Sequence, residues 1–572
     1  MKAQSDNKIS RGEAAGILLL LLCLGICILR LPCGACGPDE ALYLSIPRRV
    51  MQGDRLLIHE WQVIQLSSLL LLPLLRAYVG ITGAFAGAYL AFRWLFVFFH
   101  GLTACGIYLR LRKQTLPGAV LAAAIYLVFA PINIPSLSYY IMGIGLMSLV
   151  LLSFAAGGAS RAEAVLCGVG FGMAVICNPF YFSLYLLYTA AAAVSACRHR
   201  AGWACLRGRH WLLFTAGGAL VAGYACAKLF LHTDAALLTK TLPLVLFSDA
   251  EHPARGILSL AYSLLSSFRK SRFFVPTALL GAAAALLFFF DRKRDAHRSA
   301  YLIAAAGLGI LFALDFYARR DPAISVYLFP VSITGFFVWL FAGDRRDPFF
   351  FLVYLPGMVC WCCSIASSNL GYYTLSSVSA ITMLASMAFI GRSLSAALRG
   401  GRGQKAAAAC LLLSVLLPFG SITACRVRTV FPARPAAACT ERLTHGAQRG
   451  LIVSPEEKAR YDAVLTLTAP LRAEAAGAVA YFTDIPTMYL DDAKRCGVYS
   501  AWFPINYLAA NLPRLDEYWA LFPERVPAHI VIGTGDEGSD AQLLAHFSAC
   551  GYTAEALAPD LLLLTNGEVD AP

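Results

Sequence analysis

The feature that most constrains this chain is a series of apolar blocks along its first 424 residues. The blocks are about 16 to 22 residues long, and short joints containing charges, Pro or Gly separate them. A helix needs ~20 apolar residues to cross the hydrocarbon core of a bilayer, where it satisfies its own backbone hydrogen bonds. A large soluble helical protein would show polar faces at helical spacing, and these blocks lack them. We therefore predict a polytopic α-helical membrane protein.

The pattern predicts about thirteen spans. They are Ala14–Leu31, Phe85–Leu109, Leu116–Ile132, Ile141–Gly158, Ala162–Cys177, Phe180–Cys197, Trp211–Leu231, Val275–Phe290, Ala300–Tyr317, Ile324–Phe341, Phe349–Ala366, Leu375–Ile390 and Ala406–Ala424.

Lys and Arg predict the orientation, because short loops rich in these residues stay on the cytoplasmic side. With the N-terminus inside, every inner loop is basic; examples are Arg110/Arg112/Lys113 and Arg292/Lys293/Arg294. An odd number of spans then places the C-terminal segment outside. We expect a multi-pass protein of the cell membrane with a cytoplasmic N-terminus and an extracytoplasmic C-terminal domain.

Two other bulk properties exclude function classes. The net charge of +13 lies mostly in the inner loops, with no basic stripe interleaved with aromatics, so the partner is the bilayer and not nucleic acid. Most of the 18 cysteines fall inside apolar blocks, where a thiol behaves as a small hydrophobe. No pair of Cys-x-x-Cys motifs predicts a zinc site.

The chain divides into two predicted domains. Residues 1–424 form the transmembrane domain, with long outer loops at 32–84 and 232–274. The stretch Trp61–Tyr78 has polar residues at its start, so we interpret it as a helix along the outer interface. Residues 425–572 alternate strand-like and helical runs, which predicts a small α/β domain with a largely parallel sheet.

The strands expected in this domain are Gly450–Val453, Ala478–Phe482, His529–Ile532 and Leu561–Leu564, and the helices include Pro455–Leu465 and Asp540–Cys550.

The first outer loop carries the residues best suited to chemistry. It begins Gly37-Pro38-Asp39-Glu40-Ala41-Leu42-Tyr43 and continues through Arg48-Arg49 to Gly53-Asp54. Adjacent acids directly after a span are costly to desolvate and are commonly functional. Asp39 capping a short interfacial helix would explain one carboxylate, but not the whole set.

Asp-Glu-x-x-Tyr followed by Arg-x-Met-x-Gly-Asp resembles the first outer loop of GT-C membrane glycosyltransferases. The most similar families are the protein O-mannosyltransferases and the aminoarabinose transferases of lipid A. The motif covers residues 37–54, and the expected topology is also similar. The resemblance implies inverting transfer of a sugar from a polyprenyl-phosphate donor to a lipid, glycan or protein acceptor at the outer face.

The resemblance also implies roles for residues. Asp39 matches the catalytic base, and Glu40 would shape the same pocket or position the acceptor. Candidate substrate-binding residues are Tyr43, Arg48, Arg49, His59, Glu60, Gln65, Lys240 and Arg255. Outer cations suit a phosphate leaving group, although contact with anionic lipid headgroups is the alternative for any one of them.

The sequence departs from the family pattern after Asp54. Where many relatives have a Lys-Pro-Pro segment, this chain has His59-Glu60-Trp61-Gln62. The next outer loop, Pro131–Tyr140, lacks the second acid that relatives often carry. His59, Glu60, Asp249 and Glu251 are alternatives for that acid. No cofactor is firmly predicted, and a divalent cation held by Asp39, Glu40, His59 and Glu60 is left open.

Two other functions compete with the transferase. A transporter or flippase predicts internal repeats and broken helices with charges near mid-membrane, and neither pattern is present. A catalytically inactive binding or assembly relative is the other, and the missing second acid is its main support.

Overall fold

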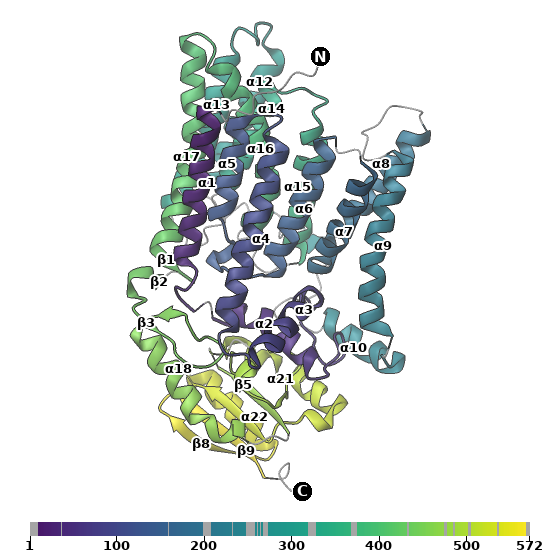
Figure 1. Cartoon of the computed structure of the whole chain (residues 1–572), viewed down its shortest axis with the longest axis vertical. Helices are drawn as coiled ribbons and strands as arrows, with labels where there is room; N and C mark the ends of the chain where they lie inside the picture. Colours follow the sequence, from purple (N-terminus) through teal and green to yellow (C-terminus); the bar gives the residue numbers. More distant parts are fainter. Residues whose placement is uncertain are drawn as a thin grey trace.

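The computed structural model describes residues 10–35, 37–157, 160–197, 207–231, 233–247, 273–318, 328–367, 374–431, 434–473, 477–483, 485, 487–501, 505–534 and 537–567, with three residue pairs between 258 and 266. Long helices form a bundle, and the α/β domain lies at the end opposite the N-terminus (Figure 1). The bundle helices are α1 (Arg11–Arg30), α4 (Ala88–Leu111), α5 (Leu116–Val128), α6 (Tyr139–Ala155), α7 (Arg161–Cys177), α8 (Phe182–Cys197), α9 (Gly208–Phe230), α12 (Phe274–Phe290), α13 (Arg298–Ala318), α14 (Leu328–Ala342), α15 (Leu355–Ser367), α16 (Thr374–Ala397) and α17 (Arg402–Arg428).

Every predicted span coincides with one of these helices, and most ends agree within about four residues. The largest difference is at α16, which continues past the predicted end at Ile390 to Ala397. The predicted span Phe349–Ala366 begins with a π-helical stretch, Phe350–Tyr354, that leads into α15. In the described part of the chain, 8 helices are long and apolar enough to cross a membrane by length and composition. Six further apolar helices are shorter, so the number of spans stays a prediction.

The loops predicted to lie outside, called the outer loops below, contain three α-helices whose bounds the structure describes. These are α2 (Gly37–Met51), α3 (Ser68–Thr82) and α10 (Ala235–Phe247), and the sequence analysis missed α10. The segment Gln65–Thr82 is one of those apolar enough to cross a membrane. Nevertheless α3 packs on α2 at the end of the bundle nearest the α/β domain, a position compatible with an interfacial helix (Figure 1).

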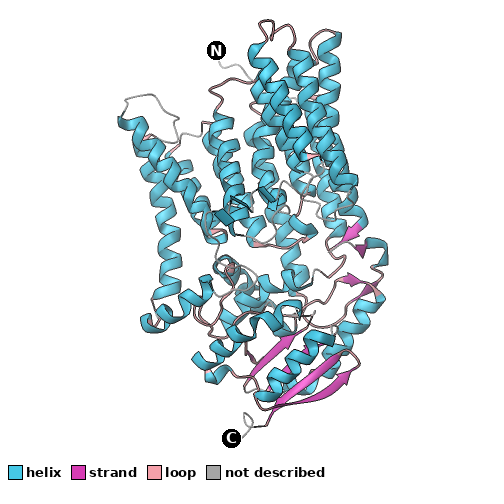
Figure 2. Ribbon diagram, turned by 180° about the vertical axis from the view of Figure 1, so that it is seen from behind, coloured by secondary structure: helices cyan, strands magenta, loops and turns pink. Residues whose placement is uncertain are grey.

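The C-terminal domain contains a five-stranded sheet covered by helices (Figure 2). Its strand order is β6-β5-β7-β9-β8. The strands are β5 (Ala478–Phe482), β6 (Arg495–Cys496), β7 (His529–Gly533), β8 (Tyr552–Ala558) and β9 (Leu561–Asn566), and the longer helices are α18 (Pro455–Leu467), α21 (Ile505–Leu521) and α22 (Glu537–Ala549).

The prediction of a largely parallel sheet was wrong. β5 pairs in parallel with β6 and β7, but β7 pairs antiparallel with β9, and β9 antiparallel with β8. Two strands of this sheet were missed, the two-residue β6 and β8. The exposed and polar positions of β8 hid its strand character, and β8 forms a hairpin with β9 through a short turn. A hairpin needs no crossover helix, so its strands run antiparallel.

One apolar core joins the α/β domain to the outer end of the bundle. It contains Leu31 after α1, Tyr43 of α2 and Phe92 of α4, together with Val479 and Leu515 of the α/β domain. Trp61 is 1% exposed; its ring stacks on Tyr499 with centroids 5.3 Å apart. The two predicted domains, divided near residue 424, therefore share a hydrophobic core.

Two helices of the bundle approach through glycines. A Cβ added to Gly168 of α7 would lie 2.0 Å from the Phe214 carbonyl oxygen of α9, and one added to Gly217 would lie 2.2 Å from the Val165 oxygen of α7. Neither backbone atom can rotate away. Small residues that allow such backbone approach are a common basis of helix packing in membranes.

We expect Gly217→Ala to force α7 and α9 apart and to lower stability by about 1–3 kcal/mol, the usual cost of overpacking. Thermal unfolding of the protein in lipid nanodiscs measures this loss. Gly223→Ala on the same helix is the matched control, because no atom lies within 4 Å of its added Cβ. Equal unfolding temperatures for the two variants would contradict the close packing.

Candidate active site

The two adjacent acids lie in the first turn of α2. The helix begins at Gly37, whose φ of 59° is in the left-handed region that glycine tolerates. Asp39 and Glu40 are therefore inside the helix, which corrects the alternative that Asp39 caps it. Both carboxylates therefore lie near the positive end of the helix dipole.

Glu40 is clamped by an arginine that the sequence analysis missed. Arg93, from α4, donates from Nε to Glu40 Oε1 at 2.7 Å and from a terminal nitrogen to Oε2 at 2.6 Å. The same guanidinium donates to the carbonyls of Leu31 and Gly34. Arg93 is 0% exposed and Glu40 is 1% exposed. A lone arginine inside the predicted span Phe85–Leu109 was the available signal, because such a residue needs a partner.

Asp39 itself is half-buried, so it differs from its fully buried neighbour. One turn further along α2, Tyr43 faces α6, and its ring lies 6.2 Å from that of Tyr139. Burial raises the pKa of the Tyr43 hydroxyl, and the nearby negative charge of Asp39 raises it further. Tyr43 is therefore a neutral hydroxyl group close to Asp39.

The second outer loop approaches α2 in a constrained conformation. Ile132 and Asn133 have φ of 54° and 59°, a region that a β-branched residue rarely adopts. Asn133 accepts a hydrogen bond from Arg426 at 2.7 Å and donates to the Thr429 carbonyl at 3.1 Å. These contacts tie the loop to the end of α17. Strained backbone held by surrounding contacts occurs often at functional sites.

The far end of α2 enters a buried cluster of four charges. Arg49 donates to Asp54 and to Glu60, each at 2.8 Å, and Arg525 of the α/β domain lies 2.6 Å from the other Asp54 oxygen. All four are under 5% exposed. When both acids are ionised, the two positive and two negative charges balance, which limits the desolvation cost of burying them. It joins the first outer loop to the α/β domain.

The cluster shifts the pKa of its members in different directions. Burial alone would raise the pKa of Asp54, but Arg49 and Arg525 outweigh it and lower that pKa. For Glu60, burial dominates over Arg49 and raises the pKa to about 7. The pKa of His59 falls to about 4 because burial disfavours its charged form; Asp54 opposes this shift, while Arg525, Arg49 and Arg55 add to it.

The other predicted site residues are dispersed. Half-buried Arg48 donates to the Asp492 carbonyl at 3.3 Å and lies over the Phe85 ring. Buried Gln65 accepts from the Leu57 amide at 2.6 Å, and Lys240 is exposed on α10. Arg255, like the alternative acids Asp249 and Glu251, lies outside the described residues.

Two of these placements do not suit the predicted substrate contacts. The Arg49 guanidinium donates to Asp54, to Glu60 and to the His59 carbonyl, so this arrangement holds it within the fold. Glu60 is enclosed with it. Near α2, Arg55 is exposed, and Asp39 and Arg48 are among the polar residues that stay partly exposed.

The four residues considered as cation ligands do not form a set. Arg93 engages Glu40 and Arg49 engages Glu60, while His59 Nδ1 accepts the Arg55 amide at 2.9 Å. Within the described ranges, the group of metal-binding side chains with mutually close ligand atoms lies elsewhere, in the α/β domain.

Together these features define a polytopic helical protein whose first outer loop is fixed between the bundle and a small α/β domain. No protein-family model and no curated protein matches the sequence. Among solved structures, the chain is similar to ArnT from Cupriavidus metallidurans in the apo state, and to the same protein bound to undecaprenyl phosphate. In both comparisons the TM-score is 0.46 and the sequence identity is 13%. Each comparison covers 98% of this chain, together with 100% of the apo ArnT chain and 99% of the lipid-bound ArnT chain. Both are aminoarabinose transferases, one of the two families that the first outer loop resembles.

Replacing Arg93 should destabilise the outer end of the bundle. We expect Arg93→Leu to lower the free energy of unfolding by about 3–5 kcal/mol, because it leaves the Glu40 charge buried without its partner. Thermal unfolding in nanodiscs measures the effect, with Arg442→Leu on exposed β3 (Glu441–Arg442) as control. The double variant Glu40→Leu/Arg93→Leu should recover part of the loss. A single variant as stable as the wild type would refute the clamp.

His59 should make the protein less stable in mild acid. Its pKa is about 4 in the folded protein and 6.5 ordinarily, so between these values the unfolded chain binds more protons. Stability then rises with pH across this window and is lost as pH falls through it. His59→Gln keeps an acceptor for the Arg55 amide but does not titrate. The stability difference between wild type and His59→Gln, measured from pH 7 to 4, should shrink or reverse in acid; a constant difference would count against this placement.

Proposed function

We propose that this protein is a membrane glycosyltransferase that uses a polyprenyl-phosphate sugar as donor. It transfers the sugar to a lipid, glycan or protein acceptor at the outer face of the membrane, with inversion at the anomeric carbon. Asp39 is the catalytic base. The proposal joins the resemblance of residues 37–54 to the geometry of the first outer loop.

The observation that carries the proposal is that the two adjacent acids have different environments. Glu40 is locked to Arg93, and this pair fixes the first turn of α2 against α4. Asp39 is thereby held half-exposed where α1 ends and the outer loop begins. A general base needs this combination of fixed position and access to a reactant.

The reaction follows from the donor chemistry. The acceptor hydroxyl oxygen attacks the anomeric carbon opposite the phosphate, and its proton passes to the Asp39 carboxylate. The bond between the anomeric carbon and the phosphate oxygen breaks, and the polyprenyl phosphate departs with the bonding electrons. A positioned base contributes typically 10²–10⁴-fold to such a step. A phosphate leaving group needs cations rather than an acid.

Cations are present in the first outer loop and on the helix that contacts it. Arg48 and Arg55 belong to the same loop as Asp39, and Lys240 lies on α10, whose neighbour Thr241 donates to the Leu57 carbonyl of that loop at 2.7 Å. We assign Arg48, Arg55 and Lys240 to the donor phosphate as a set. Tyr43 lies close enough to Asp39 to position an acceptor hydroxyl.

Asp39→Asn should abolish donor turnover while the protein stays folded. The expected loss is about 10²–10⁴-fold, because asparagine accepts a hydrogen bond but cannot remove a proton. The measurement is release of free undecaprenyl phosphate from a panel of undecaprenyl-phosphate sugars, using purified full-length protein in lipid. The lipid follows the one named for a similar structure.

Asp234→Asn is the matched control, since Asp234 is an exposed outer acid whose contact to the Ala236 amide an asparagine can keep. It should release lipid at the wild-type rate. Equal turnover by Asp39→Asn and the wild type would refute Asp39 as the base. No release from any donor by folded wild-type protein would favour a binding, assembly or transport role instead.

A further inference from the structure

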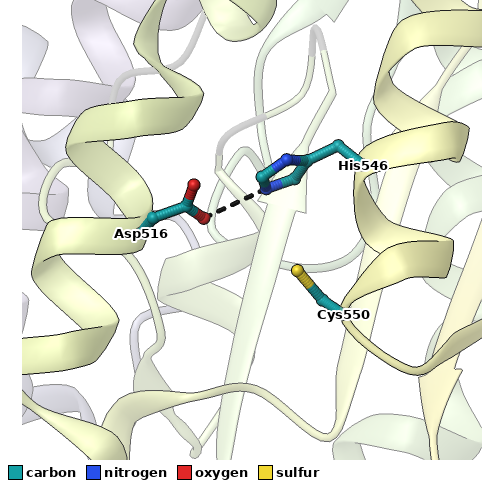
Figure 3. Close-up of side chains that lie close together, drawn as sticks. All are labelled: Asp516, His546 and Cys550. Atoms are coloured by element: carbon teal, nitrogen blue, oxygen red, sulfur yellow. Dashed lines mark hydrogen bonds and ion pairs between the residues drawn. The ribbon is translucent and has the colours of Figure 1, made fainter.

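A second group of reactive side chains lies in the α/β domain, on the side of the sheet covered by α21 and α22. Asp516 comes from α21, His546 from the last turn of α22, and Cys550 directly follows α22. Figure 3 shows the three side chains pointing toward one another across the space between the helices. Among the described residues, the group consists of these three side chains and includes no acid or histidine of the first outer loop, so its chemistry is separate from that of Asp39.

The helix geometry places two of the residues on one face. His546 and Cys550 are four residues apart, and the Cys550 amide donates to the His546 carbonyl at 3.2 Å, so the helical turn continues between them. Gly551, with φ of 85°, then ends the helix. An imidazole and a thiol at this spacing form a two-ligand platform on one helical turn.

The third side chain comes from the neighbouring helix. His546 Nε2 and Asp516 Oδ1 are 3.0 Å apart, and one ligand atom from each of the three residues lies within 4.8 Å of the others. Ligand atoms around a tetrahedral zinc ion are about 3.3–3.8 Å apart, given zinc–ligand bonds of ~2.0–2.3 Å. Side-chain rotations that move the ligand atoms by about 1 Å are enough to bring them to zinc-binding distances. All three residues are at least partly exposed, which permits such rotation.

We propose that Asp516, His546 and Cys550 bind a divalent transition-metal ion of the zinc class. Thiolate, imidazole and carboxylate are the ligands that zinc takes in proteins, and three protein ligands leave a fourth position for water or another ligand. On binding, the Cys550 thiol gives its proton to solvent and coordinates as the thiolate. His546 binds through Nε2 as the neutral imidazole with its hydrogen on Nδ1, so a hydrogen held at Nε2 against Asp516 passes to solvent while Nδ1 takes one up. Calcium and magnesium are disfavoured, because they prefer sets of oxygen ligands.

A metal ion at this site would restrain α21, the helix that contacts the first outer loop. On α21, Arg514 donates to the carbonyls of Trp61 and Leu244, at 3.3 and 2.9 Å. The Tyr518 ring packs edge-on against Trp61 with centroids 5.2 Å apart. Asp516 lies between these two residues in the sequence. An ion that bridges α21 to α22 would therefore restrain the helix that contacts the loop.

Cobalt is a direct probe of this site, since Co²⁺ occupies zinc sites and reports its ligands by absorption. Chelator-treated full-length protein in nanodiscs is titrated with Co²⁺. The expected result is saturable binding of one ion per chain, with sulfur-to-cobalt charge transfer in the near ultraviolet and tetrahedral d–d bands in the visible. Zn²⁺ should displace Co²⁺ and remove both signals.

Variants assign the ligands. Cys550→Ser should abolish the charge-transfer band, and His546→Ala and Asp516→Asn should each weaken Co²⁺ binding at least tenfold. The matched controls are Cys439→Ser, a half-buried thiol elsewhere in the same domain, and His297→Ala, from the His297–Asp291 pair that has a similar 2.8 Å contact. Both should bind Co²⁺ as the wild type does. Thermal unfolding without metal checks that each variant folds.

A second readout is independent of spectroscopy. Zn²⁺ at 100 times its Kd should raise the free energy of unfolding by about 2.7 kcal/mol in the wild type and leave Cys550→Ser unchanged. A charge-transfer band that persists in Cys550→Ser would overturn the proposal. So would the absence of saturable binding by the folded wild type, or equal Zn²⁺ stabilisation of wild type and Cys550→Ser. Asp39-dependent release of undecaprenyl phosphate is a separate measurement, and its failure would leave these outcomes unaffected.

Discussion

The ion pair between Glu40 and Arg93 is the contact on which the outer end of the molecule depends. Two charges that are almost completely withdrawn from water incur a large desolvation cost, which excellent geometry must offset. The two-pronged contact supplies this geometry, and the carbonyls of Leu31 and Gly34 use the remaining guanidinium hydrogens. The connection from α1 to α2 is thereby held against α4, and Asp39 takes its position from it.

The α/β domain completes this arrangement rather than standing apart from it. Asp54 is neutralised by Arg49 from its own loop and by Arg525 from the domain, and Trp61 is enclosed by Tyr499 and Tyr518. Without the domain, the charge cluster would lose a cation and the tryptophan would lose its cover. The α/β domain therefore packs directly against the first outer loop and helps to hold it in place.

The sequence predicted the helical elements well, because a bilayer imposes a strict requirement on length and polarity. Strands such as β5 and β7 were also found, since buried strands show as continuous apolar runs. The hairpin of β8 and β9 was not, because β8 alternates little and its partner follows it directly. Without the β8–β9 hairpin, the antiparallel pairing in this half of the sheet could not be predicted.

The candidate site was predictable only in part. The motif indicated Asp39 and Glu40, but which of the other charged residues of the loop are buried could not be predicted. Arg93, Arg525 and Arg426 are distant in the chain, and their pairing with Glu40, Asp54 and Asn133 depends on tertiary contact. Which acid is enclosed and which stays accessible followed from those partners. Asp516, His546 and Cys550 gave no signal, because two of them are on one helix and the third is on another.

These contacts join residues that are far apart in the sequence, so they form late during synthesis of the chain. The hydrogen bond from Arg514 to the Trp61 carbonyl joins residues 453 positions apart. At about 5–20 residues per second, a ribosome needs roughly 20–90 s to make the intervening chain. During that interval Arg49 already has Asp54 and Glu60 beside it in the nascent loop, so most of the cluster can form locally. Arg525, Tyr499 and Tyr518 arrive last, and only then does Trp61 gain its full cover. The loop thus exposes an aromatic surface until the rest of the chain has been made, and the α/β domain, which is synthesised last, covers it.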